Sequence, residues 1–430
     1  MYQLWEKISN NCFLHYSSLS NSFLILNQNK HELYCQVANI DSLILIDSKL
    51  FETLKSGKFI IPDDFNEKTY VLEQKQKMIN NTSLYNIVIN TTLDCNLNCW
   101  YCYETKIKGS HITQETIKAI KQNIVLTYNE QHYSVLKLSF FGGEPFLFFE
   151  GIKDILLFAK EYCTTNSIEL IADFTTNATI ISDKHIDFLK DFRCHFQITL
   201  DGGRNTHNKV KIDQNGILDT YQKTIDVLNE INKNKNINNR WVAIRINFDN
   251  RTLAEIGDII SDLNFMDRKK CYVIIKKVWQ LKTNLVDKKL LINAIQSFFN
   301  QGFLVDYYYM PKGCVCFAER KNQVLFNYDG KIFKCTTISS FDDNNALGQL
   351  NFSTGAIHWH KGKITDWYKE LQPEYCKNCV WFPSCLGICN RQLLAHQGEH
   401  ICTFDAFNLT RKEYLMYLFK YNILQNEISY

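Results

Sequence analysis

The chain has 430 residues, of which 45% are hydrophobic and 13% aromatic, and it carries a formal charge of only +3. This length and apolar content suffice for two or three packed domains, whereas the balanced charge excludes the strong positive field that wholesale nucleic-acid binding requires. No apolar segment follows a basic start at the N-terminus, and no later stretch approaches about 18 uninterrupted apolar residues, so we expect a cytoplasmic protein that binds neither nucleic acid nor membrane.

The first 84 residues predict a small domain of mixed strands and short helices. We expect strands at FLHYSS (13–18), NSFLILN (21–27) and KFIIP (58–62). Helices are expected near DSKLFETLKSG (47–57), with Gly57 at its C-terminal end, and at EKTYVLEQKQKMINN (67–81). This mixture predicts a winged-helix-like module over residues 1–84.

From Tyr85 onward, apolar runs alternate with amphipathic segments. The runs cover 85–92, 136–141, 168–177, 195–200, 242–248 and 271–279, and the helical segments between them include 114–128, 151–163, 219–232 and 253–265. Strands that alternate with helices predict parallel βαβ units with right-handed crossovers. A polar stretch over 229–240 is expected to be a loop. Six such units form either a doubly wound sheet or a partial barrel.

Polar motifs follow or close five of these runs. They are Cys95–Cys102, Gly142–Pro145, Thr176–Asn177, Thr199–Gly202 and Asn247–Asn250. The carboxyl ends of parallel strands meet at one edge, where barrels of this type gather their active-site loops. We therefore predict a partial (β/α)6 barrel, similar to a TIM barrel, over residues 85–302, with one functional rim.

The sixteen cysteines are unevenly distributed. Eleven lie in two dense blocks, at 95–102 and 314–402, which favours metal binding over a disulfide framework. The other five are expected to be small buried apolar side chains, namely Cys12, Cys35, Cys163, Cys194 and Cys271. The first block, DCNLNCWYC, spaces its cysteines as C-x3-C-x2-C. Three thiolates can hold a cubane 4Fe–4S cluster with one iron open, and the alternative is a zinc site with a distant fourth ligand.

Cys95, Cys99, Tyr101 and Cys102 form a C-x3-C-x-aromatic-C pattern that resembles the signature of radical S-adenosylmethionine (SAM) enzymes. The resemblance covers residues 85 to 280. It implies that the open iron chelates the amino and carboxylate groups of SAM. Gly142-Gly143-Glu144-Pro145 is similar to the family's GGEP loop, in which glycines permit close approach and the carboxylate suits the SAM amino group.

Further rim motifs carry the same resemblance. Thr176-Asn177 resembles the family's TNG, with Ala178 in place of glycine, and 199–202 resembles SLDG. His207–Lys211 resembles HDxxR, so that Lys211 stands where an arginine often meets the SAM carboxylate and keeps the charge without the bidentate fork. Arg245 and Asn247 are candidates for the same rim, and a salt bridge on the strand face is their alternative role. The SAM contacts implied are Tyr101, Gly142, Gly143, Glu144, Asn177, Thr199, Asp201, Lys211, Arg245 and Asn247.

The remaining cysteines lie in a tail that we assign to a third domain, residues 303–430. Cys316, Gly330 and Cys335 are followed by C-x2-C-x5-C-x3-C and a last cysteine, a pattern that resembles the SPASM domain with its two auxiliary 4Fe–4S clusters. The resemblance implies one cluster on Cys376, Cys379, Cys385 and Cys402. It implies a second on Cys335, Cys389 and Cys316, with Cys314 as a candidate fourth ligand or with one iron open. A zinc site at the C-x2-C pair is the alternative.

The resemblance implies three 4Fe–4S clusters and SAM, which is cleaved to a 5′-deoxyadenosyl radical. It points to a maturase that installs an oxidative thioether or carbon–carbon cross-link in a ribosomally synthesised precursor peptide. The partners would be the leader of that peptide, bound by residues 1–84 as an added strand, and a reduced flavodoxin- or ferredoxin-type electron donor. A structural cap or dimerisation unit is the alternative for this module.

Three alternative functions stay open. A sulfatase-maturing type of enzyme would oxidise a Cys or Ser of a protein substrate, but that family carries an aspartate base directly after the cysteine of G-x4-C, where this chain has Thr336. The others are a pseudoenzyme that only binds a peptide and an iron–sulfur electron-transfer protein. No residue of the sequence identifies itself as the catalytic base.

Overall fold

The computed structural model describes residues 2–37, 39–233, 241–369 and 371–428. The chain divides into two compact units, and each is described by itself. The first, here called the terminal unit, comprises Met1–Ile79, Tyr309–Cys316 and Lys369–Lys420. The second, the sheet unit, comprises Asn80–Tyr308, Phe317–Tyr368 and Tyr421–Tyr430. The domain boundaries expected at residues 84 and 302 stay predictions.

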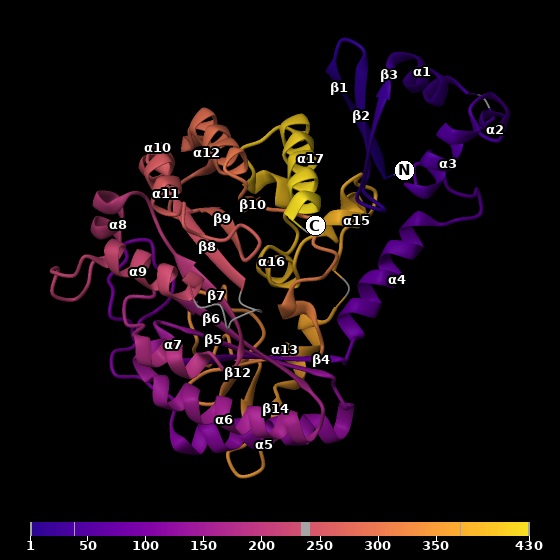
Figure 1. The fold of residues 1–430 in the computed structure, drawn as a ribbon. Coiled ribbons are helices and arrows are strands. Elements are labelled where there is room, and N and C mark those ends of the chain that lie inside the picture. Colours follow the sequence, from indigo (N-terminus) through magenta and orange to yellow (C-terminus); the bar gives the residue numbers. More distant parts are fainter. Residues whose placement is uncertain (1, 38, 234–240, 370, 429–430) are drawn as a thin grey trace. The chain divides into compact units, whose positions relative to one another are not determined.

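The sheet unit is built on one large sheet (Figure 1) with the strand order β10-β9-β8-β7-β6-β5-β4-β11-β12-β13-β14. Its six central strands pair in parallel in chain order and coincide with the six apolar runs: β4 (Leu84–Thr92), β5 (Val135–Gly142), β6 (Glu169–Thr176), β7 (Arg193–Thr199), β8 (Trp241–Phe248) and β9 (Cys271–Lys277). The predicted α/β class with a partial parallel barrel is thus confirmed.

Short strands from later in the chain extend both edges of this sheet. β10 (Leu304–Asp306) pairs in parallel with β9, and β11 (Gln323–Phe326) pairs in parallel with β4. Three antiparallel strands continue beyond β11: β12 (Lys331–Phe333), β13 (Gly348–Leu350) and β14 (Ile357–Trp359). Part of the cysteine-rich tail therefore belongs to the same sheet as the barrel strands.

Helices connect the parallel strands, as the amphipathic segments predict. Figure 1 shows α5 and α6 side by side below the sheet. The helical elements of this unit are α5 (Gln114–Gln131), η1 (Pro145–Phe148), α6 (Phe149–Thr165), α7 (Asp183–Leu189), α8 (Arg204–Val210), α9 (Thr220–Lys233), α10 (Asn250–Ala254), α11 (Ile256–Asp262), η2 (Thr283–Leu285), α12 (Lys288–Asn300), η3 (Phe317–Glu319) and α13 (Lys361–Trp367). Of the expected loop at 229–240, residues 229–233 form the end of α9, and residues 234–240 lie outside the described residues.

The two faces of the parallel strands differ in chemistry because successive side chains point to opposite faces. On one face, Phe140, Phe174 and Phe196 of three adjacent strands are buried and stack in a row, with ring centroids 5.3 and 5.2 Å apart. This face forms the core against the helices. The alternate residues of the same strands, such as Lys137 and Asp173, are polar and line cavities on the other face.

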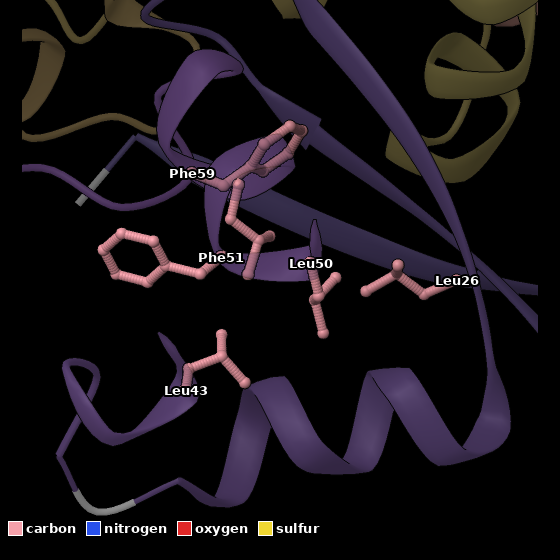
Figure 2. Close-up of a cluster of buried hydrophobic side chains, with 6 residues drawn as sticks. Leu26, Leu43, Leu50, Phe51 and Phe59 are labelled. Carbon is pink, nitrogen blue, oxygen red and sulfur yellow. The ribbon is translucent and has the colours of Figure 1, made fainter. Parts of the chain in front are cut away.

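The terminal unit begins with three antiparallel strands, β1 (Gln3–Ser9), β2 (Cys12–Ser17) and β3 (Ser22–Asn27), in the order β1-β2-β3. They are followed by α1 (Gln28–Gln36), α2 (Ser42–Ile46), α3 (Ser48–Ser56) and α4 (Glu67–Asn80). Leu26 of β3, Leu43, Leu50 and Phe51 of the helices, and Phe59 form a buried cluster with Leu54 (Figure 2).

The strand expected at KFIIP (58–62) does not form, because Lys58 and Phe59 cap the C-terminal end of α3 instead. Lys58 adopts the left-handed conformation with φ 53°. The N–H of Phe59 donates to the carbonyl of Leu54 at 2.8 Å, and the N–H of Lys58 donates to the carbonyl of Lys55 at 3.0 Å. These two bonds are those of a Schellman motif. Gly57 precedes the left-handed residue, and Phe59 turns inward to join the buried cluster.

The cysteine-rich segment 369–420 packs on the N-terminal strands within the terminal unit. The Tyr2 hydroxyl donates to the carbonyl of Lys377 at 2.6 Å, and the Tyr16 hydroxyl lies 2.8 Å from that of Ser384. The helical elements of this segment are α14 (Glu374–Lys377), α15 (Phe382–Cys385), α16 (Asn390–Ala395), η4 (Thr403–Ala406) and the first part of α17 (Arg411–Ile428). Within the described part of the chain, no helix combines the length and apolar character needed to cross a bilayer.

Candidate active site

The carboxyl ends of the parallel strands enclose a cavity of about 160 Å³, here called the rim cavity. Its wall includes the three cysteines of the loop after β4 and polar residues from the ends of the next four strands. Among the predicted site residues, the wall contains Cys95, Cys99, Tyr101, Cys102, Gly142, Gly143, Asn177, Thr199, Lys211, Arg245 and Asn247. Glu144 and Asp201 are fully buried behind this wall.

Two glycines allow the loop after β5 to lie directly against the cysteine loop. Gly142 has φ 115°, and a Cβ atom there would stand 2.1 Å from the carbonyl oxygen of Thr92. A Cβ atom on Gly143 would stand 1.9 Å from the carbonyl oxygen of Asp94, next to Cys95. Backbone hydrogen bonds of 3.0 and 2.9 Å, from the N–H groups of Gly143 and Glu144 to these two carbonyls, hold the loops together. Any side chain at these positions would displace the cysteine loop.

Glu144 connects the second loop to the third. Its carboxylate accepts hydrogen bonds from the backbone N–H of Phe146 at 3.1 Å, the hydroxyl of Thr176 at 2.8 Å and the backbone N–H of Asn177 at 2.8 Å. Burial raises the pKa of Glu144 to about 7, and these three donors oppose that shift. The carboxylate therefore shapes the loop that carries Asn177, while its predicted contact with the SAM amino group stays a prediction.

Asn177 in turn reaches the cysteine loop. Its side-chain amide donates to the side-chain oxygen of Asn96 at 3.0 Å and lies 3.9 Å from the sulfur of Cys95. The next residue, Ala178, has φ 66°, which is the left-handed region that favours glycine. The backbone of this chain thus adopts the conformation of the family's TNG loop although the glycine is replaced.

A buried network joins Tyr101 of the cysteine loop to the ends of β7 and β8. The Tyr101 hydroxyl donates to the carboxylate of Asp201 and accepts from the side-chain amide of Asn247 at 3.2 Å. Asp201 also accepts the backbone N–H of Asn247 at 2.6 Å. Burial, followed by the nearby Asp201 carboxylate, raises the pKa of Tyr101 well above its usual range, so that the phenol stays protonated.

Lys211 and Arg245 are the two cations expected near the SAM carboxylate, and their surroundings differ. The Lys211 ammonium lies 3.5 Å from the Asp201 carboxylate and donates to the Thr199 hydroxyl at 2.6 Å, so its charge is already compensated. The Arg245 guanidinium donates to the Asn247 side chain at 2.9 Å. Among the described residues it has no carboxylate within salt-bridge distance, so the strand-face salt bridge is not formed.

Sequence reasoning missed several residues of the rim wall. Tyr103 and Trp279 stack with ring centroids 4.7 Å apart, and both line the rim cavity together with Glu104, Phe141 and Lys277. Burial raises the pKa of Glu104 to about 8. Tyr103 and Glu104 directly follow the cysteine motif, and Trp279 ends the sixth apolar run. These positions next to the predicted rim were the only feature of the sequence that could have identified them as wall residues.

The rim residues fit a 4Fe–4S cluster with a bound cofactor. Three thiols share one cavity wall, the glycine pair packs the next loop directly against their loop, and the side-chain amide of Asn177 lies beside Cys95. Within the described residues, no group of three or more His, Cys, Asp or Glu side chains converges on a single metal ion. A cubane does not need such convergence, because each thiolate binds a different corner.

The tail cysteines divide between the units. Cys376, Cys379, Cys385 and Cys402 all belong to the terminal unit, and burial, followed by the Cys385, Cys402 and Cys379 thiols, raises the pKa of Cys376 to about 12. The other three predicted ligands therefore lie within electrostatic reach of Cys376. Of the second predicted set, Cys314, Cys316 and Cys389 belong to the terminal unit and Cys335 to the sheet unit. Both sets stay predictions.

The five isolated cysteines do not share one environment. Cys163, Cys194 and Cys271 are buried, as expected. Cys12 is partly exposed and Cys35 is exposed, so the expectation of buried apolar side chains is wrong for these two, which lie at the edge of the small N-terminal core rather than inside a large one.

Comparisons with known proteins agree with this geometry. Residues 89–263 match the Radical SAM superfamily. The cysteine-type anaerobic sulfatase-maturating enzyme of Clostridium novyi is 22% identical over 339 residues, which cover 72% of this chain and 88% of that enzyme. The radical SAM cyclopropyl synthase TigE of Paramaledivibacter caminithermalis is 22% identical over 393 residues, which cover 83% of this chain and 79% of that enzyme.

A solved structure shares the fold. Native anSMEcpe with bound AdoMet and Cp18Cys peptide superposes with a TM-score of 0.59 and 18% identity, covering 80% of this chain and 99% of that one. Residues 89–263, which include the cysteine loop and the strands β5 to β8, are thus a radical SAM domain, and the relatives of the chain include a sulfatase-maturating enzyme and a cyclopropyl synthase. A radical SAM domain implies a 4Fe–4S cluster and SAM as cofactors.

Proposed function

We propose that this enzyme is a maturase that installs an oxidative cross-link, either a thioether or a carbon–carbon bond, in a ribosomally synthesised precursor peptide. The observation that carries the proposal is the rim cavity, because it gathers three cysteines, two closely packed glycines and an arginine without an acidic partner at one edge of the sheet.

In this proposal Cys95, Cys99 and Cys102 hold the catalytic cluster, while Gly142, Gly143, Asn177 and Arg245 contact SAM. When bound, these cofactors supply a carbon-centred radical by one-electron cleavage of SAM. The protein contributes position and the exclusion of water. The glycine pair lets the loop after β5 pack against the cysteine loop, and the Tyr101–Asp201–Asn247 network ties the cysteine loop to the ends of β7 and β8.

The guanidinium of Arg245 is the better partner for the SAM carboxylate, because the charge of Lys211 is already compensated by Asp201. A guanidinium also binds a carboxylate with two parallel hydrogen bonds, which an ammonium cannot do. Lys211 then stabilises the buried Asp201 and, through it, Tyr101. The Tyr103–Trp279 stack forms an aromatic wall beside the cysteines.

Two auxiliary 4Fe–4S clusters in the tail complete the proposal. One is assigned to Cys376, Cys379, Cys385 and Cys402, which all belong to the terminal unit. The other is assigned to Cys335, Cys389 and Cys316, with Cys314 as a candidate fourth ligand. Clusters at these positions would accept the electron released when a substrate radical is oxidised, which fits a net two-electron reaction. A reduced flavodoxin or ferredoxin is the proposed electron donor.

A peptide is the proposed partner. The solved relative anSMEcpe binds a peptide, which supports this class of substrate. In the small antiparallel sheet β1-β2-β3, the strand β3 pairs only with β2 among the described residues, so its outer edge can accept a leader peptide as an added strand. The module over residues 1–84 is therefore proposed as the leader-binding part.

The second candidate is a sulfatase-maturating enzyme, which the similarity to the Clostridium enzyme favours. Thr336 opposes it, because this residue stands where that family has its aspartate base, and it lines a cavity next to the rim cavity. A threonine hydroxyl does not accept a proton at neutral pH. We therefore favour the cross-linking maturase.

The test is anaerobic co-expression of the enzyme with each short reading frame that flanks its gene, followed by measurement of the intact mass of each peptide. We expect a loss of about two hydrogens per modified site. A triple variant with alanine at Cys95, Cys99 and Cys102 is the control and should leave the peptide unmodified. Conversion of a sulfatase-derived cysteine peptide to an aldehyde, with no change in any neighbouring peptide, would instead establish the second candidate.

A further inference from the structure

Within the terminal unit, a lysine side chain is buried next to the segment that carries the tail cysteines. Lys75 lies on α4 and is only 3% exposed. Its ammonium donates a hydrogen bond of 2.9 Å to the carbonyl of Leu386, the residue that follows Cys385. Lysine is rarely buried to this extent, because removing an ammonium from water is costly unless its partners compensate for it. The burial of this charge at this place therefore indicates a specific role.

The backbone that accepts this hydrogen bond forms an unusual turn. Leu386 has φ 56° and Gly387 has φ 85°, so two consecutive residues lie in the left-handed region, which is unfavourable for leucine. A Cβ atom at Gly387 would stand 2.0 Å from Oε1 of Gln372, so only glycine leaves room for that side chain. Gln372 in turn bonds to both the N–H and the carbonyl of Ile388. These contacts fix the turn, and with it the carbonyl that binds Lys75.

The same face of α4 packs directly on one of the cysteines. Val71 lies one turn before Lys75 and belongs to a buried cluster with Cys376, Phe382 and Ile388. Side chains four residues apart share a face of a helix, so Val71 and Lys75 point toward the same segment. Burial, followed by three nearby thiols, raises the pKa of Cys376 to about 12, and the charge of Lys75 opposes this rise. Lys75 therefore lies within electrostatic reach of Cys376.

The thiols next to this lysine suit a 4Fe–4S cluster. Cys376 is 8% exposed, and the thiols of Cys379, Cys385 and Cys402 act on it electrostatically. The N–H of Cys379 donates to the carbonyl of Cys376 at 3.0 Å, so these two ligands share one turn. The sulfur of Cys385 lies 3.8 Å from the hydroxyl of Thr403, the residue after Cys402. Four thiols with these contacts, beside a buried apolar cluster, match the ligand set of a cubane.

The exposed charges next to Cys376 differ from Lys75 in their surroundings. The carboxylate of Glu374 is exposed and lies 3.3 Å from the ammonium of Lys68 and 3.2 Å from that of Lys377. Opposite charges so close together largely cancel at a distance, and water and salt screen them. Lys75 is enclosed by protein, where the effective dielectric constant is lower and a charge acts more strongly. Its charge is therefore better placed to act on a cluster held by these cysteines.

We propose that Lys75 raises the reduction potential of an auxiliary cluster held by Cys376, Cys379, Cys385 and Cys402. The cluster itself rests on the proposed function, whereas the place of Lys75 rests on its own contacts. Reduction adds one negative charge to a thiolate-bound cluster, and a nearby ammonium favours the more negative state. In the proposed reaction the substrate radical loses one electron and this cluster gains it, with no proton or further reactant involved. Lys75 thus makes that transfer more favourable.

The test is an anaerobic redox titration of the reconstituted full-length protein, monitored by electron paramagnetic resonance. The signal of this cluster is the one that disappears from a variant with alanine at Cys376, Cys379, Cys385 and Cys402. Lys75→Gln removes the charge but keeps a hydrogen-bond donor for the carbonyl of Leu386. We expect the equilibrium constant for reduction of this cluster to fall about tenfold, which corresponds to a decrease of about 60 mV for one electron.

Three further variants separate the charge from the packing of the side chain. Lys75→Met fills a similar volume without a charge and should lower the potential as Lys75→Gln does, so either neutral variant gives the answer if the other fails to fold. Lys75→Arg keeps the charge, and its equilibrium constant should stay within about twofold of the wild-type value. Lys77→Gln removes an exposed charge from the same helix, so it is the matched control and should change nothing.

An unchanged potential in a neutral variant that keeps its iron would overturn the proposal. Loss of iron from both neutral variants would also overturn it, because Lys75 would then be needed to hold the cluster rather than to set its potential. A wild-type protein without this signal would refute the cluster and the inference together.

Failure of the proposed function is visible separately in the co-expression experiment. A modified peptide combined with an unchanged potential would refute only the role of Lys75. A lowered potential with no modified peptide would establish that role and assign the cluster to a different reaction.

Discussion

The carboxylate of Glu144, on the loop after β5, accepts a 2.8 Å hydrogen bond from the backbone N–H of Asn177, on the loop after β6. Asn177 itself touches Cys95 and Asn96 of the cysteine loop. One buried carboxylate therefore determines how three neighbouring loops of the rim are arranged, although it is absent from the cavity wall.

Replacement of Glu144 by alanine should strongly destabilise the protein. The N–H groups of Phe146 and Asn177 and the hydroxyl of Thr176 would lose their acceptor in a fully buried place. We expect the free energy of unfolding to fall by roughly 2–5 kcal/mol, measured by anaerobic urea unfolding. Glu150→Ala removes an exposed acid of α6 and should change stability by less than about 0.5 kcal/mol. Equal effects would contradict this role of Glu144.

Replacement of Gly143 by alanine should displace the cysteine loop, because the new Cβ would lie 1.9 Å from the Asp94 carbonyl oxygen. We expect the purified variant to lose about four iron atoms per chain, measured by iron analysis after anaerobic reconstitution. Gly257→Ala on α11 has no heavy atom within 4 Å of the added carbon and serves as the control. Full iron content in the Gly143 variant would show that the loop tolerates the displacement.

Arg245→Gln should weaken SAM binding if the guanidinium takes the SAM carboxylate. We expect an increase in the dissociation constant of roughly 10- to 100-fold, and a smaller increase for Arg245→Lys, which keeps the charge without the bidentate geometry. Equilibrium dialysis of the reconstituted enzyme with radiolabelled SAM measures this directly. The control is Arg251→Gln, because Arg251 pairs with Asp249 on the exposed surface of α10. An unchanged dissociation constant for SAM in Arg245→Gln would instead favour Lys211 as the residue that binds the SAM carboxylate.

The N-terminal module should lose stability in acid through His15. Its Nε2 lies 3.0 Å from Nδ1 of His31, and burial, followed by the neighbouring His31, lowers the pKa of His15 from 6.5 to about 4. The unfolded chain therefore binds more protons than the folded one between these pH values, so stability falls as the pH decreases through this range.

From pH 7 to pH 5, this difference amounts to about 2 kcal/mol of unfolding free energy. His15→Gln removes the titrating group, so the free energy of unfolding of this variant should decrease less over the same interval. Urea unfolding of both proteins at the two pH values, followed by circular dichroism, gives the comparison. Identical pH dependence of the two proteins would exclude His15 as the cause.

The proposed cluster of the terminal unit can be tested by counting iron. A variant with alanine at Cys376, Cys379, Cys385 and Cys402 should contain about 8 instead of about 12 iron atoms per chain. Cys163→Ala, at a buried cysteine of α6 far from either cysteine block in the sequence, should keep the full complement. An iron content of only about four atoms per chain in the wild-type protein would refute the proposal of three clusters.

The sequence was sufficient to predict the six parallel strands, because each is a long apolar run followed by a helix. It also predicted which loops meet, since carboxyl ends of parallel strands share one edge. The outer strands β11 to β14 escaped detection because runs of three or four residues carry no periodic signal, and their position depends on pairing with β4.

Side-chain roles within the site were harder to read from the sequence. The motif predicts that Glu144 lies on the loop after β5. The direction of its carboxylate, however, depends on hydrogen-bond donors of Phe146, Thr176 and Asn177, two of which come from a different loop. Similarly, nothing in the segment around Lys211 reveals that Asp201 neutralises it, because that contact spans a loop and a helix. The polar barrel interior follows from register, which only the assembled sheet defines.

The parallel pairing of β11 with β4 also has a consequence for synthesis of the chain. Ile89 lies on β4, inside the large sheet, yet its partner Phe326 on β11 leaves the ribosome more than two hundred residues later. At elongation rates of about 5–20 residues per second this is a delay of roughly 10–50 seconds, during which the hydrogen-bonding edge of an apolar strand stays uncovered. Slower translation would lengthen that interval, so the yield of folded protein should depend on access to chaperones during synthesis as well as on cluster supply afterwards.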